Sequence, residues 1–101
     1  MVNRPDLHKT LIRILGSKSV YFQPPESTKL TYPCIIYEET KGRATRANDL
    51  LYLYRKAYGG VIVDKDPDSD IPDKVRALPM CDVDRPYKAD NLYHWPFTIF
   101  I

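Results

Sequence analysis

The fold is decided by Tyr58-Gly-Gly-Val-Ile-Val-Asp64, which runs into Lys65-Asp-Pro-Asp-Ser-Asp70 and then Ile71-Pro-Asp-Lys-Val-Arg-Ala-Leu78. The first segment is rich in β-branched residues, which favours a strand. The acidic segment is typical of a turn, and either Ser69 or Asp70 can cap the helix that follows. The stretch therefore predicts a strand, an acidic turn and a short helix over residues 71–78.

Upstream of this stretch, the sequence predicts a long hairpin. The strand is expected to begin at residue 49, and a partner strand is expected over residues 32–40. Residues 41–48 between them are basic and contain no large apolar residue, so we predict a loop there. The two strands are expected to pair antiparallel across this basic loop. Gly59-Gly60 indicates a bulge or a close backbone approach.

The remaining elements are predicted from apolar spacing. Residues 6–15 have apolar residues at helical spacing, with Asp6 able to cap the start and Gly16 able to end the helix. Short strands are expected at residues 19–22 and 80–83, and a longer one at residues 92–101. A turn-rich loop is expected at residues 84–91.

This order predicts the α+β fold class, because helices and strands are mixed without a regular βαβ alternation. We predict a single domain over residues 1–101, with a mainly antiparallel sheet of four to five strands and two helices packed on one face. A chain of 101 residues is long enough for one domain and too short for two.

Charge and hydropathy exclude some classes of protein. The net charge of +2 is too small to mark a general nucleic-acid binder. No apolar run approaches the roughly 18 residues that a membrane-spanning helix needs. Residues 1–5 lack the apolar core of a signal peptide, so we expect the protein to be made and kept in cytoplasm.

The cysteines and acidic residues do not form a recognisable metal site. Cys34 and Cys81 are expected to be buried free thiols, and a disulfide between them is the alternative. Their spacing from the two histidines does not match a zinc site. The acidic turn resembles the start of a calcium loop but has Ser69 where glycine belongs and Val75 where glutamate belongs. We therefore expect neither a metal nor a cofactor.

No catalytic constellation can be named from the sequence. His8 and His94 are isolated from any serine or cysteine nucleophile, and Cys81 could reach His94 only through the tertiary fold. The carboxylates are similarly scattered. Because an active site usually leaves a polar constellation, we predict that the protein is not an enzyme.

Five segments, taken in order, resemble a family of small proteins from tailed bacteriophages. They are the N-terminal helix with Leu7, Leu11 and Leu15; Val20-Tyr-Phe-Gln-Pro-Pro25; Tyr32-Pro-Cys-Ile-Ile-Tyr37; Val63-Asp-Lys-Asp-Pro-Asp-Ser69 with Ile71-Pro-Asp-Lys74; and Tyr87-Lys-Ala-Asp-Asn-Leu-Tyr-His94. The family comprises tail-completion, head–tail joining and minor capsid proteins, and the element order also resembles tail terminators. Gly59-Gly60 departs from the expected pattern.

The resemblance implies a structural role in the virion. Tail terminators form a ring, typically a hexamer, at the head-proximal end of the tail tube, where they stop polymerisation and meet the head connector. It therefore implies self-association, contacts with the tail tube protein and the connector or stopper protein, and DNA passing through the lumen. The expected location is the head–tail interface, after assembly in the cytoplasm of a bacterial host and without a membrane.

Two sets of residues are candidate contacts in such a ring. Lys41, Arg43 and Arg46 in the basic segment are candidates for the lumen or the tail tube, although a solvated hairpin tip explains them as well. Tyr93, Trp95 and Phe97 are candidates for the subunit interface, because aromatic residues are enriched in interfaces. A head-closure stopper protein is the alternative function, and a cellular protein-binding module using the aromatic C-terminal region is the alternative from another class.

Overall fold

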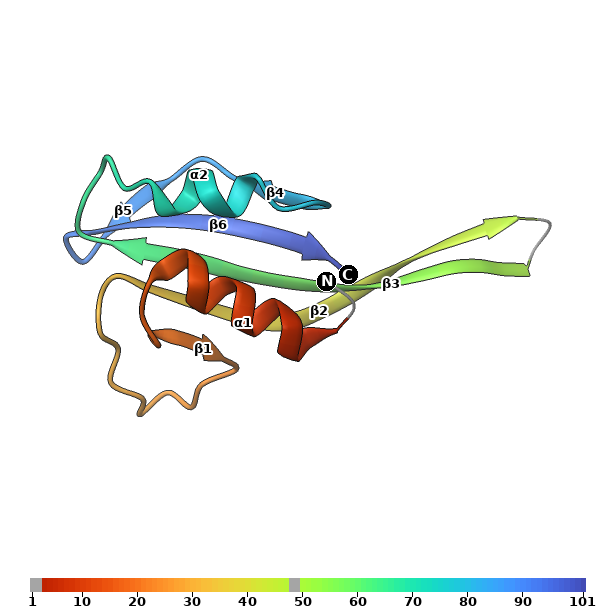
Figure 1. Ribbon diagram of the computed structural model, residues 1–101, viewed down its shortest axis with the longest axis horizontal. Helices are drawn as coiled ribbons and strands as arrows, with labels where there is room; N and C mark the ends of the chain where they lie inside the picture. Colours follow the sequence, from red (N-terminus) through yellow and green to blue (C-terminus); the bar gives the residue numbers. More distant parts are fainter. Residues whose placement is uncertain (1–2, 48–49) are drawn as a thin grey trace.

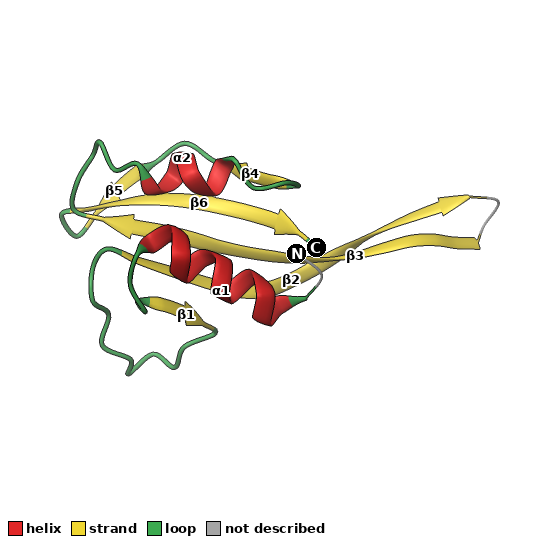
Figure 2. Ribbon diagram, in the orientation of Figure 1, coloured by secondary structure: helices red, strands yellow, loops and turns green. Residues whose placement is uncertain are grey.

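We describe residues 3–47 and 50–101 of a computed structural model of the chain and, over residues 41–55, the backbone alone. Two helices lie against a six-stranded sheet (Figures 1 and 2). The elements are α1 (Arg4–Leu15), β1 (Val20–Phe22), β2 (Cys34–Ala47), β3 (Leu50–Asp64), α2 (Ile71–Arg76), β4 (Cys81–Val83), β5 (Tyr87–Ala89) and β6 (Leu92–Phe100). The predicted α+β class is confirmed.

The sheet has the strand order β1-β2-β3-β6-β4, and β5 pairs with the other end of β6. β1 runs parallel to β2, and every other pair is antiparallel. The central β2–β3 hairpin is confirmed, with Ile35 opposite Ile62. On the other side of β3, Ile62 faces Trp95 of β6.

The two helices cover one face of this sheet (Figure 1). Because side chains alternate along a strand, partners in register share a face, so Ile35, Ile62 and Trp95 all point to the same side. That side meets the buried Leu7 and Leu11 of α1. The opposite face carries alternate residues and has no helix on it. We call the two sides the helix-covered face and the open face.

Helix α1 begins earlier than the sequence indicates. The Asn3 side-chain oxygen accepts a hydrogen bond from the Asp6 N–H at 3.0 Å, so Asn3 is the N-cap and Asp6 lies in the first turn. The predicted end at Gly16 is confirmed, because Gly16 adopts φ 79° and its N–H donates to the Ile12 carbonyl.

Two expected loops are partly strand. Residues 41–47 continue β2, which corrects the predicted basic loop up to Ala47, and residues 87–89 form β5 within the predicted loop 84–91. The sixth strand is therefore β5, which pairs with β6 through Tyr87 opposite His94. The expected loop end at Asn48 and strand start at Asp49 lie outside the described residues.

Helix α2 is shorter than predicted and ends at Arg76. Asp70 is its N-cap but makes no capping hydrogen bond through its side chain, whereas the Ser69 hydroxyl accepts from the Ile71 N–H at 3.3 Å. Ile71 and Val75 are buried against the sheet, as the apolar spacing predicts.

Candidate functional site

A two-stranded arm projects from the body of the domain (Figure 1). The neighbour of β2 on one side, β1, pairs only as far as Tyr37. On the other side, β6 pairs with β3 as far as Ala57, and Ile101 adds reciprocal backbone hydrogen bonds with Lys56 at 3.0 and 3.1 Å. Beyond that point β2 and β3 pair only with each other. We call residues 41–47 and 50–55 the arm.

The arm contains all three predicted lumen or tube residues. Lys41, Arg43 and Arg46 lie on its β2 strand, and their side chains lie outside the described residues. Arg43 is in register with Arg55 of β3, so two cationic residues occupy directly opposed positions. Like charges that face each other across a strand pair are destabilising. The returning strand carries the apolar run Leu50-Leu-Tyr-Leu-Tyr54.

The base of the arm is fixed by a cation–tyrosine–histidine cluster on the helix-covered face. The Arg4 guanidinium lies 4.4 Å from the centroid of the Phe22 ring and donates a hydrogen bond to the Tyr37 hydroxyl at 3.4 Å. That hydroxyl lies 2.7 Å from Nδ1 of His8. Burial, followed by the Arg4 charge, lowers the pKa of His8, so the neutral ring is favoured. Its tautomer sets which partner donates the hydrogen bond to the other.

Next to this cluster, a pocket of about 400 Å³ opens between α1, β3 and the end of the chain. It is lined by Asn3, Arg4, Pro5, Phe22, Glu39, Lys56, Tyr58 and Ile101.

The Tyr37 hydroxyl of the cluster stays protonated. Burial raises the pKa of Tyr37, and the Arg4 hydrogen bond and charge oppose that rise. The phenol is therefore a structural hydrogen-bonding group that ties α1 to β2.

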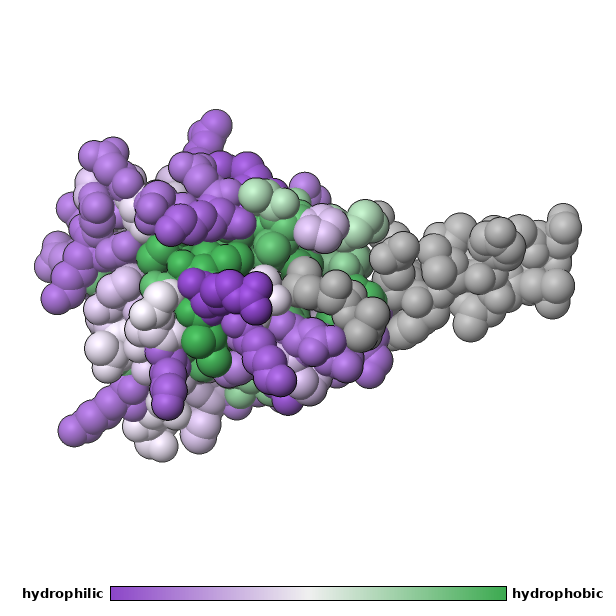
Figure 3. Space-filling model, viewed as in Figure 1, coloured by the Kyte–Doolittle hydropathy of each residue, from purple (hydrophilic) through white to green (hydrophobic). Residues whose placement is uncertain are grey.

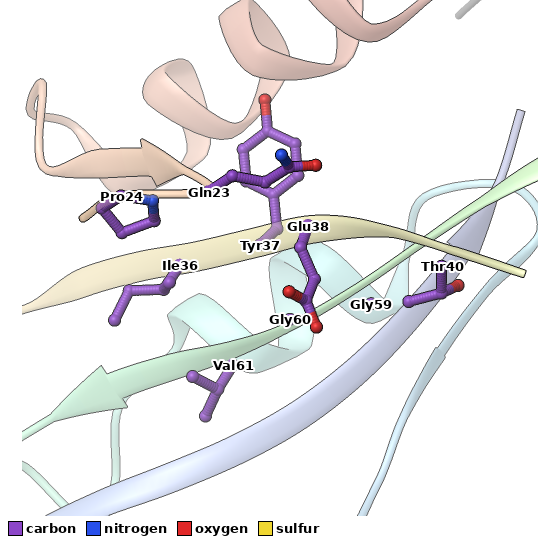
Figure 4. A pocket seen from close by; sticks show the side chains of 9 residues that line it. All are labelled: Gln23, Pro24, Ile36, Tyr37, Glu38, Thr40, Gly59, Gly60 and Val61. Carbon is purple, nitrogen blue, oxygen red and sulfur yellow. The ribbon is translucent and has the colours of Figure 1, made fainter. Parts of the chain in front are cut away.

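A groove of about 480 Å³ crosses the open face where β2 passes β3 (Figure 4). It is lined by Gln23, Pro24, Ile36, Tyr37, Glu38, Thr40, Gly59, Gly60 and Val61. In Figure 4 the Tyr37 ring points toward α1, whereas Glu38, Ile36 and Val61 lie on the other side of the sheet. Among the residues that line the groove, Glu38 is the one ionisable side chain that points to the open face. The groove therefore offers no acid–base pair.

The double glycine on β3 explains the shape of the groove and confirms the expected close approach. A Cβ on Gly60 would overlap the Ile36 carbonyl oxygen and lie 2.7 Å from the Cβ of Tyr37. A Cβ on Gly59 would lie 3.0 Å from a methyl group of Thr40, which is a side chain that can move. Gly60 is therefore the position that requires glycine.

The cysteines are free, and their positions exclude the disulfide alternative. Cys34 lies on β2 and Cys81 on β4, three strand spacings apart, or about 14 Å, whereas a disulfide needs Cα atoms within about 7 Å. Burial raises the pKa of each thiol to about 11. Both are therefore protonated at neutral pH and are poor nucleophiles.

The histidines are engaged elsewhere. The ring of His94 stacks on Tyr87 with centroids 4.9 Å apart, and its Nδ1 lies 3.2 Å from the Leu92 carbonyl oxygen. His94 lies five residues from Ile99, the partner of Cys81 on β6, so the fold does not bring Cys81 and His94 together. Over the described side chains, no three His, Cys, Asp or Glu residues group closely enough to hold a metal.

The three predicted interface aromatics fall mostly in the core. Trp95 is 6% exposed and Phe97 is 3% exposed, and both belong to the cluster beneath the helices. Both side chains are packed within the chain, and their assignment to a subunit interface stays a prediction. Tyr93 is half-buried, with Lys88 Nζ 5.8 Å from its ring centroid. The alternation along β6 could have indicated this, because residues 95, 97 and 99 share one face.

The surface has features that sequence reasoning missed. Met80 and Tyr87 are the large apolar residues that remain about half exposed among the described side chains. Met80 has a φ of 58° and lies in a turn before β4. Composition alone does not indicate this turn, so the exposure of Met80 could not be expected from the sequence. On the face shown in Figure 3, apolar residues gather around the two helices and hydrophilic residues cover the end opposite the arm.

Comparisons with known proteins give no relative for this chain. No protein-family model, no curated protein and no solved structure matches it. Among the described residues, none of the helices has the length and apolar character required to cross a membrane.

Proposed function

We propose that this protein is a non-enzymatic assembly protein of a tailed bacteriophage, a tail terminator or head–tail joining protein that forms a ring at the head-proximal end of the tail tube. The observation that carries the proposal is the arm, which projects from a small α+β body and, over the described residues, pairs only with itself beyond Lys56. Rings are built from heterologous contacts between copies, and a projecting arm can supply one side of such a contact.

The chemistry of the described residues is compatible with this role. The thiols are protonated, His8 and His94 are engaged in structural contacts, and the open-face groove offers a single carboxylate. The arm supplies Lys41, Arg43 and Arg46, which are the proposed contacts with the tail tube or with DNA in the lumen. The proposed partners are the tail tube protein and the head connector.

The test is to delete the gene from the phage genome that encodes it and to image the lysate by negative-stain electron microscopy. Filled heads beside unattached, overlong or irregular tails are the expected result. Normal-length tails beside emptied heads would instead assign the protein to the stopper ring of the connector. Intact infectious particles would overturn both virion functions and leave a cellular binding module.

Complementation of the deletion then tests the arm. A K41A/R43A/R46A variant is expected to fail to restore joined particles, because the proposed contact loses three cations. The matched control is K9A/R13A/K18A, which removes three exposed cations from α1 and the turn after it. Equal rescue by both variants would remove the arm from the proposed function.

A further inference from the structure

Over the described residues, the two strands of the arm pair with no third strand. An isolated two-stranded hairpin is at best marginally stable in water, and unpaired strand edges readily accept another chain. The arm has two such edges, and its sequence includes the five-residue apolar run 50–54. Both features indicate that the arm is covered by a partner when the protein works.

The charges of the chain are separated between its two ends. Residues 41–56 contain five basic residues and one acidic residue, whereas residues 64–73 contain five acidic residues and one basic residue. The basic segment contains the start of β3, which is the longest strand, and the acidic segment begins at its last residue. The two segments therefore lie at opposite ends of a molecule 49 Å long (Figure 1). We call residues 64–73 the acidic turn.

The acidic turn is held in shape by its own hydrogen bonds. The Asp64 and Asp66 carboxylates accept the N–H groups of Asp66 and Asp68 at 3.1 and 2.9 Å. Asp70 pairs with Lys74 at 3.4 Å, and Asp73 pairs with Arg76 at 2.8 Å. Within the described side chains, the other three aspartates have no ion pair, so the turn presents uncompensated negative charge on a fixed backbone.

We propose that the arm of one copy docks on the acidic turn of the next copy. The inference rests on the proposed ring and names the contact that would build it. It assigns the cations of the arm to the contact between copies, in place of the tail tube or the lumen. A surface at one end that binds a different surface at the other end gives a heterologous contact, which closes into a ring or extends into a filament. Docking places carboxylates beside the opposed Arg43 and Arg55, which relieves their repulsion.

A second copy fits the arm better than nucleic acid does. One strand of the arm is basic, but the returning strand carries the apolar run 50–54. Most protein–DNA hydrogen bonds go to phosphate and sugar, and the leucines of this run have no side-chain group that can form them. Protein interfaces combine arginine and tyrosine with apolar area. The opposite charges of the arm and the acidic turn supply the electrostatic complementarity.

The experiment mixes two charge-reversed full-length chains. R43E/R46E places two glutamates on the arm and cancels its net positive charge. D68K/D70K places two lysines on the acidic turn and cancels its net negative charge, without removing the Asp64 and Asp66 hydrogen bonds. Sedimentation velocity at low ionic strength should show that wild type self-associates and that salt weakens the association. Each variant alone should associate at least about tenfold more weakly. An equimolar mixture should recover the oligomer, because the unaltered arm of one variant meets the unaltered turn of the other and the introduced glutamates meet the introduced lysines.

Controls separate the contact from folding and from general charge effects. Circular dichroism reports whether each variant folds, and D68N/D70N weakens the same contact without introducing lysines. K9E/R13E makes the same change in net charge as R43E/R46E on α1 and should associate as wild type does. The inference would be overturned if the wild type were monomeric. It would also be overturned if either variant associated by itself as the wild type should, or if the mixture stayed monomeric.

Different measurements distinguish this inference from DNA binding by the arm and from the proposed function. If R43E/R46E associates normally but loses binding to a fluorescent DNA duplex, the arm is a DNA contact and the inference is overturned. If the chains associate as described but gene deletion leaves intact virions, the inference stands and the proposed function fails. If deletion blocks joining but both reversed variants complement it, the proposed function stands and the inference fails.

Discussion

The same two strands, β2 and β3, build both the best-buried and the least-supported parts of this protein. In the body, Ile35 and Ile62 face each other beneath α1 and are fully buried. In the arm, the strands keep their antiparallel pairing but lose β1 and β6 as neighbours. Backbone pairing therefore does not by itself create a core, and flanking strands and helices decide which half of the hairpin stabilises the fold.

The largest expected effect contrasts these two halves directly. Ile62→Ala should lower the free energy of unfolding by about 2–5 kcal/mol, because a buried aliphatic side chain leaves a cavity. Replacing residues 42–55 with Asn-Gly, which closes a two-residue hairpin between Lys41 and Lys56, should change it by about 1 kcal/mol or less. Urea unfolding measures both. An arm deletion as costly as Ile62→Ala would show that the arm stabilises the body.

The next effect concerns the crossing of the two strands at the double glycine. Gly60→Ala should cost about 1–3 kcal/mol, because the new methyl group overlaps the β2 backbone. Gly59→Ala is the matched control and should cost clearly less, because the methyl group lies 3.0 Å from the Thr40 side chain and 3.8 Å from the nearest backbone atom, the Phe97 carbonyl oxygen. Thermal unfolding followed by circular dichroism compares them, and equal melting temperatures would contradict the assigned close approach.

A smaller effect is expected at the base of the arm. Tyr37→Phe removes the hydroxyl that links Arg4 to His8 and should cost about 0.5–1.5 kcal/mol in urea unfolding. The stacking of the ring with Phe22, at 5.0 Å between centroids, is retained. Tyr21→Phe is the control, because its hydroxyl accepts a single long hydrogen bond from the Thr31 N–H at 3.4 Å. A cost at Tyr21 equal to that at Tyr37 would argue against the cluster.

The smallest effect is a pH dependence carried by His8. Its pKa is lowered in the folded state, so the unfolded state binds the proton more readily. The stabilising contribution is complete above the ordinary histidine pKa of about 6.5 and declines as pH falls through that value toward the folded pKa. Urea unfolding of wild type and His8→Gln between about pH 5 and 8 should therefore differ in slope. Parallel profiles would contradict the burial of the neutral ring.

The α+β class and most elements could be predicted from local pattern. Apolar spacing located α1, and Gly16 marked its end because glycine adopts a positive φ without a side-chain clash. The β-branched run before Asp64 located β3, and the two glycines just before that run indicated the close approach at Gly60. These signals are local, so they do not depend on what the chain packs against.

The candidate site was less predictable, because its signals are not local. Residues 41–47 lack large apolar side chains, so composition favoured a loop, but pairing with residues 50–55 extends the strand. Trp95 and Phe97 are residue types that are common in protein interfaces. They lie in the core because the two helices cover their face of the sheet. β5 exists because Tyr87, Lys88 and Ala89 find partners on β6.

By itself, the sequence determined the fold class, the position of each main helix and strand, the glycine crossing and the separation of basic from acidic segments. Only the tertiary structure decided that β1 lies parallel to β2, which aromatics of β6 are buried, and that the basic segment is a strand of a projecting arm. The physical reason is that a strand's hydrogen bonds and burial come from other segments. Local residues can favour a strand, but distant partners decide its length and which of its faces meets water.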